Sequence, residues 1–202
     1  MANYYISDVH GFHKNVTAEG TNFDGRPFKT LDEMHDEMLR RWNERITNSD
    51  TVFILGDMLW RVSDESIAWV AKMRGKKVLC RGNHELLKDH RYTQLFTEIC
   101  DYKEITDNYN GINHNLVLSH FPIMAWNKMN KGSILLYGHV HNNSFDEQNF
   151  NEALNRANEY YKNRDGERYK LIKAFNVGCM KDYMDYTPRT LKEIIDANRV
   201  EM

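Results

Sequence analysis

The chain of 202 residues is long enough for one domain with a substantial buried core, and we expect a single domain over residues 1–202. Its 27 basic and 29 acidic side chains give a net charge of −2, which excludes a global positive field that would attract nucleic acid or an anionic membrane surface. The sequence has no long apolar stretch and no secretory signal at its start, so we expect a soluble, cytoplasmic protein without a membrane partner. The three cysteines are few and far apart, which favours free thiols over a disulfide framework.

Short apolar or β-branched runs alternate along the chain with amphipathic helical patterns. The runs predict strands at residues 4–7, 51–55, 77–80, 116–119, 134–137 and 174–177. A first helix is predicted over residues 31–46, where Thr30 and Glu33 form a capping box, and a second begins after Ser63. A last helix is predicted to begin with Thr187 as its N-cap and Pro188 at its first position. This alternation predicts a layered α/β fold.

Two further segments qualify this fold prediction. Residues 107–111, which read Asp-Asn-Tyr-Asn-Gly, are typical of a hairpin turn, so part of the sheet structure should be antiparallel or mixed. Residues 142–170 predict a polar, Asn-rich helical insertion whose sparse apolar face consists of Leu154, Ala157 and Tyr161. We interpret this insertion as an excursion from the domain and not as a second domain.

Polar clusters that contain metal-binding residue types lie mostly at the ends of predicted strands. Four of the five clusters follow a strand directly; in chain order the clusters are Asp8-Val9-His10, Gly56-Asp57, Gly82-Asn83-His84-Glu85, Ser119-His120 and Gly138-His139-Val140-His141. Because ligand sites in α/β sheets gather at the carboxyl ends of strands, we expect these clusters to converge. Residues two apart on an extended chain project from the same face, so two of the clusters offer paired ligands. The glycines allow the backbone to turn sharply or approach closely.

The side chains in these clusters indicate transition metals. Imidazole and carboxylate groups suit manganese, iron, zinc or nickel, whereas calcium prefers a cage of oxygen atoms. The sequence therefore predicts a site for two such divalent ions, with the ligands Asp8, His10, Asp57, Asn83, His120, His139 and His141.

The ordered set of motifs Asp-x-His, Gly-Asp, Gly-Asn-His-Glu, His and Gly-His-x-His, over residues 8–141, resembles the signature of the calcineurin-like metallophosphoesterases. The runs at residues 26–28, 42–43 and 50–53 resemble a small, capless bacterial and phage subgroup of that family. The resemblance implies a central β-sandwich of mixed sheets flanked by helices. It also implies that one metal is held by Asp8, His10 and His141 and the other by Asn83, His120 and His139, with Asp57 as the bridging ligand.

The same resemblance implies catalytic roles. Asp57 and His84 are predicted to be catalytic, Asn83 and His84 are predicted to bind substrate, and Glu85 should support the metal ligands. His84 would contact phosphoryl oxygens or protonate the leaving oxygen. Many relatives have a second acidic residue three positions after the aspartate of the Gly-Asp motif, where this chain has Trp60, so His84 would lack its usual carboxylate partner.

These residues predict a hydrolase of phosphomonoesters or phosphodiesters, in which a hydroxide held between two metals attacks phosphorus in line. The expected substrate is a small phosphorylated molecule such as a nucleotide, and a homo-oligomer is compatible with the sequence. Two alternatives stay open: a nuclease, which the near-neutral charge disfavours, and a non-catalytic metal-binding scaffold, which the intact ligand set disfavours.

Several side chains near the clusters are candidates for substrate contact, although a structural role is commoner for each type. Trp60, Trp126 and Tyr137 are candidates for stacking on a nucleobase, and packing in the core or at the rim is the commoner role of such aromatics. His13 and Arg61 are candidate phosphate contacts.

Overall fold

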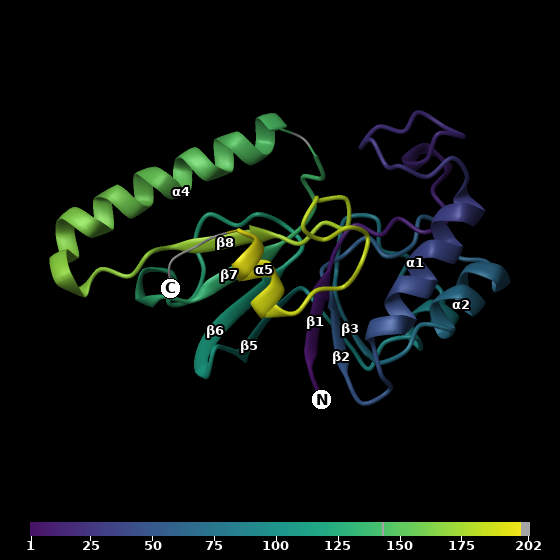
Figure 1. Ribbon diagram of the computed structural model, residues 1–202, viewed down its shortest axis with the longest axis horizontal. Helices are drawn as coiled ribbons and strands as arrows, with labels where there is room; N and C mark the ends of the chain where they lie inside the picture. Colours follow the sequence, from purple (N-terminus) through teal and green to yellow (C-terminus); the bar gives the residue numbers. More distant parts are fainter. Residues whose placement is uncertain (143, 199–202) are drawn as a thin grey trace.

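The structure is a computed structural model that describes residues 1–142 and 144–198. Two four-stranded sheets form its centre, with helices on their outer sides (Figure 1). The first sheet has the order β1-β2-β3-β4 and all its pairs are parallel; its strands are β1 (Asn3–Ile6), β2 (Thr51–Ile54), β3 (Lys76–Cys80) and β4 (Glu98–Cys100). The second has the order β5-β6-β7-β8; its strands are β5 (Tyr102–Tyr109), β6 (Ile112–Ser119), β7 (Ile134–Tyr137) and β8 (Lys173–Asn176).

The second sheet is mixed, as the hairpin prediction requires. β5 and β6 pair antiparallel, whereas β6 with β7 and β7 with β8 pair parallel. The turn between β5 and β6 consists of Asn110 and Gly111, which have φ values of 50° and 84°. Positive φ at both positions is the requirement of a type I′ hairpin turn. The predicted α/β architecture of mixed sheets flanked by helices is therefore confirmed.

The two sheets meet where β1 and β8 end. Ser7 and Gly178 form an isolated parallel bridge, and Ser7 N donates a hydrogen bond of 2.8 Å to the carbonyl of Val177. Cys179 N donates in turn to the carbonyl of Ser7 at 2.8 Å. These bonds place the carboxyl ends of strands from both sheets beside one another, which is where the predicted ligands begin.

Helices α1 (Leu31–Arg45) and α2 (Asp64–Ala71) lie on the side of the first sheet (Figure 1). The inner face of α1 buries Met34, Met38 and Trp42 in the main apolar core. The start of α1 is as predicted, since Thr30 Oγ1 accepts from Glu33 N at 3.1 Å. The capping box is only half formed, however, because the Glu33 carboxylate accepts from Lys29 N at 2.7 Å and not from Thr30 N.

The prediction for the last helix is wrong by one turn. Helix α5 (Leu191–Ala197) has Thr190 as its N-cap, with Glu193 completing a capping box. The residues before it stay extended because Arg189 forms an antiparallel bridge with Tyr5 of β1. Pairing with a strand thus overrides the local helix-start signal of Thr187 and Pro188. A short helix, α3 (His90–Thr93), follows the Gly82-Asn83-His84-Glu85 cluster.

The polar insertion forms one long helix, α4 (Ser144–Asp165), which lies over the second sheet (Figure 1), and a 3-10 turn at Gly166–Arg168. Leu154 is buried and Ala157 and Tyr161 pack beside it against a second apolar cluster, as predicted. Trp126 and Tyr137 are buried members of the same cluster, so they are core residues and not stacking surfaces. In the described part of the chain no helix is long and apolar enough to cross a membrane, and all three cysteines are free thiols.

Candidate metal centre

The loops that follow strands of both sheets converge on one site. In the first sheet, Asp8 N donates to the carbonyl of Gly56 at 3.1 Å and His10 N donates to that of Asp57 at 2.9 Å, so the loops after β1 and β2 run side by side. In the second sheet, the loop after β7 contacts the first of these loops, because His139 N donates to Asp8 Oδ2 at 2.9 Å. The predicted convergence at the carboxyl ends of strands is therefore present.

Most of the predicted ligands have a backbone conformation that L-residues rarely adopt. Five of the seven have positive φ: Asp8 at 56°, His10 at 49°, Asp57 at 54°, His139 at 72° and His141 at 48°. Each such residue costs on the order of 1–3 kcal/mol relative to an ordinary conformation. This conformation is sparsely populated even for Asp and His, and it clusters at functional sites where surrounding structure holds it in place. The ligand loops thus carry a conformational cost that the remainder of the fold must offset.

Three glycines allow these loops to pack closely. A Cβ atom on Gly82 would lie 2.1 Å from Asp57 Oδ1, and one on Gly56, where φ is 94°, would lie 2.2 Å from His120 Nδ1. A Cβ on Gly138 would lie 2.4 Å from Asp8 Oδ2. No side chain fits at any of these positions without displacing a predicted ligand.

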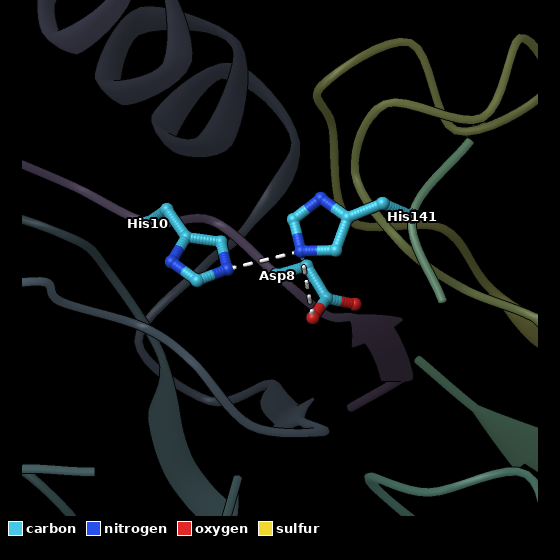
Figure 2. A group of neighbouring side chains, drawn as sticks. All are labelled: Asp8, His10 and His141. Carbon is cyan, nitrogen blue, oxygen red and sulfur yellow. Dashed lines mark hydrogen bonds and ion pairs between the residues drawn. The ribbon is translucent and has the colours of Figure 1, made fainter. Parts of the chain in front are cut away.

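A first group of ligand atoms comes from Asp8, His10 and His141 (Figure 2). The Nε2 atoms of His10 and His141 point towards each other and are 3.1 Å apart. His141 Nε2 also faces Asp8 Oδ1 at 3.7 Å. One atom from each residue lies within 4.8 Å of the others, which is close enough for all three to contact one ion.

A second group comes from Asn83, His120 and His139. The side-chain oxygen of Asn83 lies 2.9 Å from His120 Nε2 and 2.9 Å from His139 Nδ1. His120 is fully buried, and its other nitrogen, Nδ1, lies 2.8 Å from the carbonyl of Leu55. That contact fixes the ring with Nε2 directed at the site.

Asp57 lies between the two groups. Its Oδ2 is 3.6 Å from Nε2 of His10 in the first group and 3.7 Å from Nε2 of His120 in the second. Its Oδ1 accepts a hydrogen bond of 2.9 Å from His84 N, which fixes the orientation of the carboxylate. The structure therefore brings all seven predicted ligands together, and Asp57 contacts members of both groups. Asp8, Asp57 and His120 also offer ligand atoms that all lie within 4.8 Å of one another.

The chemistry of these groups fits divalent cations. Asp8 Oδ1 is buried and has no hydrogen-bond donor among the residues that the structure describes. Burial raises the pKa of Asp57, and the neighbouring Asp8 carboxylate adds to that rise. Burial likewise lowers the pKa of His10, which favours the neutral imidazole that ligates metals. Buried carboxylates close together and unprotonated ring nitrogens that face one another are arranged to contact cations.

Sequence reasoning missed a supporting pair, Asp24 and Arg26. Asp24 Oδ2 lies 3.0 Å from His141 Nδ1 and 3.1 Å from Arg26 Nε. Arg26 donates onward to the carbonyls of Asp8 at 2.8 Å and Val9 at 2.7 Å. Although burial alone would raise the pKa of Asp24, the His141 hydrogen bond and the Arg26 charge lower it. In the sequence, Arg26 belongs to the run at residues 26–28 and Asp24 stands two positions before it, but neither feature reveals their partners.

His84 and Glu85 have different environments. Glu85 accepts from Asp57 N at 2.6 Å and from the Tyr92 hydroxyl at 2.5 Å, so it does support a ligand loop. His84 is exposed, and in the described part of the chain no carboxylate lies within hydrogen-bonding distance of its ring. The ring of Trp60 lies beside it instead, with 4.7 Å between ring centroids.

The two candidate phosphate contacts are both directed at aromatic rings. His13 stacks on Trp60 with 3.9 Å between centroids and an interplanar angle of 18°. The Arg61 guanidinium lies 5.9 Å from the centre of the Phe12 ring.

Comparisons with known proteins agree with this geometry. The profile of a family described as Calcineurin-like phosphoesterase matches residues 4–200. The chain is similar to the Uncharacterized protein MJ1445 of Methanocaldococcus jannaschii, with 28% identity over 73% of each chain. It is also similar to the Gene 66 protein of Mycobacterium phage D29, with 28% identity over 68% of this chain and 77% of that protein. Among solved structures, the Protein of Unknown Function AQ665 from Aquifex aeolicus has a TM-score of 0.64 and 24% identity and covers 96% of this chain and 98% of its own, which shows a shared fold.

Proposed function

Since the chain belongs to the calcineurin-like phosphoesterase family, we propose that it hydrolyses phosphomonoesters or phosphodiesters with the help of two divalent transition-metal ions. The observation that carries this proposal is the placement of the Asp57 carboxylate between two sets of ligand atoms. Its Oδ2 lies 3.6 Å from His10 Nε2 in one set and 3.7 Å from His120 Nε2 in the other. If each of two ions used Asp57 as a ligand, both would be placed to act on one phosphoryl group.

Each ion would have its own ligands in addition to Asp57. Asp8, His10 and His141 would hold one ion, and Asn83, His120 and His139 would hold the other. Manganese, iron, zinc and nickel all suit this mixture of carboxylate, imidazole and amide groups. When bound, the ions lower the pKa of water towards neutrality and polarise the phosphoryl oxygens.

The side chains of the chain itself would position and protonate the substrate. His84 is exposed beside the site, 5.7 Å from His10 between ring centroids, and would face the oxygen of the departing alcohol. It would donate a proton to that oxygen as the ester bond breaks, while Asn83 and His84 contact the phosphoryl oxygens. Since no carboxylate of the described residues orients the His84 ring, the aromatic surface of Trp60 would limit its rotation instead.

Metal content and hydrolysis, measured together, test this proposal. The wild-type protein should take up two equivalents of a transition metal and hydrolyse an aryl phosphomonoester, an aryl phosphodiester or both. Asp57→Asn should lose metal and turnover together, whereas the same change at the exposed Asp36 on α1 should alter neither. His84→Asn should keep its metal and lose turnover, most strongly for substrates whose alcohol is a poor leaving group.

Two outcomes would favour the other readings of the sequence. Uptake of two metals without hydrolysis of any phosphate ester would favour a binding scaffold. Hydrolysis of single-stranded nucleic acid in preference to every small ester would favour a nuclease. A fully active, metal-replete Asp57→Asn protein would refute the proposed site.

A further inference from the structure

Exposed aromatic side chains surround the candidate metal centre. Phe23 is 54% exposed, Trp60 is 41% exposed and Phe121 is 43% exposed. Each contacts a histidine of the site: Phe23 lies 5.3 Å from His141 and Phe121 lies 4.7 Å from His139 between ring centroids, and Trp60 contacts His84 as described above. Large apolar side chains that gather at one place on a surface mark a binding site more often than those scattered singly.

Two of these rings, Phe23 and Trp60, form a continuous strip with the imidazole of His13 along one side of the site. His13 stacks on Trp60 and also contacts Phe23, at 5.9 Å between centroids. We call Phe23, His13 and Trp60 the aromatic strip. The strip lies beside His10 and His141 of the first ligand group, since His10 is 5.8 Å from His13 and 6.2 Å from Trp60. Phe121 lies on the opposite side, against His120 and His139 of the second group.

Core packing does not account for these exposed rings. Trp42, Trp69 and Trp126 are all buried, at 1%, 7% and 8% exposure, whereas Trp60 keeps 41%. Beside His84, where the described residues place no carboxylate within hydrogen-bonding distance of the ring, Trp60 presents an aromatic surface.

Cavities adjoin the site at both ends of the aromatic strip. One cavity of about 440 Å³ is lined by residues that include Phe23, His139 and His141. A second cavity, of about 550 Å³, is lined by residues that include Trp60, Arg61 and Leu86. A phosphoryl group held at the metal centre would thus have space and an aromatic wall beside it for an organic group. Cavities of this size accept a small molecule.

We propose that the substrate is a phosphate ester with a planar aromatic ring of the nucleobase class, and that the ring packs against the aromatic strip with Trp60 and Phe23 as specificity-determining residues. This inference rests on the proposed function of the site. A planar ring gains stacking energy from such a surface whatever its hydrogen-bonding pattern, so the strip selects for aromatic groups and not for one particular base. The net charge of −2 favours a single nucleotide over a polynucleotide strand.

A matched pair of compounds isolates the contribution of the ring. Adenosine 5′-monophosphate and ribose 5-phosphate present the same phosphate on the same primary alcohol and differ by the base. For diesters, bis(p-nitrophenyl) phosphate and methyl p-nitrophenyl phosphate share a leaving group and differ in the second arm. Binding of the two monoesters to metal-loaded protein is measured by calorimetry, and kcat/KM is measured for both pairs.

Variants then locate the surface that recognises the ring. Trp60→Ala and Phe23→Ala should each reduce the preference for the aromatic member by about 5- to 150-fold, the range that a base stacked on an aromatic side chain contributes. In the calorimetric measurement, which does not depend on proton transfer by His84, their effect on the binding of ribose 5-phosphate should be much smaller. Trp60→Phe should restore most of the preference, because it restores an aromatic face. Tyr160→Ala removes an exposed ring (60% exposed) from the C-terminal part of α4, more than four turns beyond its start, and should change nothing.

Each result bears on one of the two proposals. If the wild-type protein binds both monoesters equally, or if Trp60→Ala and Phe23→Ala weaken both equally, the inference is wrong while the proposed function stands. A strong preference for a single-stranded oligonucleotide over adenosine 5′-monophosphate would also overturn it. If no ester is hydrolysed with any of the four metals, the proposed function fails, and the calorimetric comparison still decides whether the strip recognises aromatic rings.

Discussion

Replacing Asp24 with asparagine should weaken both the fold and the metal centre. The Asp24 carboxylate is buried, with 1% of its side chain exposed, and it pairs with Arg26, whose side chain is fully buried. Asp24→Asn keeps the shape of the side chain and removes its charge. The amide oxygen can still accept from His141 Nδ1 and Arg26 Nε, which now share Asp24 Oδ2. The amide NH2 group, however, would replace an oxygen that accepts from Arg26 Nε at 3.3 Å, and it can only donate.

Two magnitudes follow from this geometry. Removing one partner of a buried ion pair costs about 3–5 kcal/mol, because the remaining charge is left uncompensated. For a chain of this length that loss lowers the melting temperature by roughly 6–20 °C. The second effect is on the metal, because a carboxylate bound to the distal nitrogen of a metal-binding histidine orients the ring and raises its basicity. Loss of such a partner typically lowers metal affinity about 10- to 100-fold.

The assay combines thermal unfolding with metal titration. Melting temperatures of the chelator-treated proteins report the ion-pair effect alone, and calorimetric titration with zinc or manganese reports the affinity. Asp165→Asn is the matched control, since Asp165 pairs with Arg164 at the solvent-accessible end of α4 and should affect neither quantity. If Asp24→Asn retains both its melting temperature and its metal affinity, Asp24 does not position His141 and this reasoning is refuted.

Three further predictions follow from the same region and from the helix beside it. A Cβ atom at Gly138 would overlap Asp8 Oδ2 at 2.4 Å, so Gly138→Ala should abolish metal uptake; undiminished metal content would contradict this. Burial lowers the pKa of His35 from 6.5 to about 4 while its ring accepts from Phe12 N. The unfolded state therefore binds the proton more readily than the folded state. As pH falls from 6.5 to 4, the free energy of unfolding of the wild-type protein should fall by about 3 kcal/mol relative to that of His35→Gln. If urea unfolding shows that the difference in free energy of unfolding between the two proteins stays constant over that pH range, this prediction is wrong. Without metal, Asp57→Asn should raise the melting temperature by removing a buried charge near Asp8, and it should abolish the rise that metal causes in the wild type; a lower metal-free melting temperature would count against this reasoning.

Short-range patterns in the sequence predicted most of the main elements and a set of candidate ligands that the structure brings together. Six of the eight strands of the two sheets coincide with apolar or β-branched runs, and α1 and α2 begin at their predicted caps. β4 is three residues long and β5 is half exposed, with alternating burial along its length, so neither has the apolar run that marks a buried strand. The start of α5 was mispredicted because a strand pairing of Arg189, distant in sequence, overrode a local signal.

The sequence by itself determined which side chains could ligate metals, because each lies directly after a strand or a glycine turn and such positions meet at one edge of a sheet. Only the tertiary structure decided their partners. Asp24 contacts His141 across 117 residues of sequence, and no local pattern encodes a contact over that separation. The same holds for exposure: Trp60 and Trp126 both lie near ligand clusters in the sequence, yet one is 41% exposed beside the site and the other is 8% exposed in a core. Exposure depends on which other segments cover a side chain, and that is settled only when the two sheets and their helices pack together.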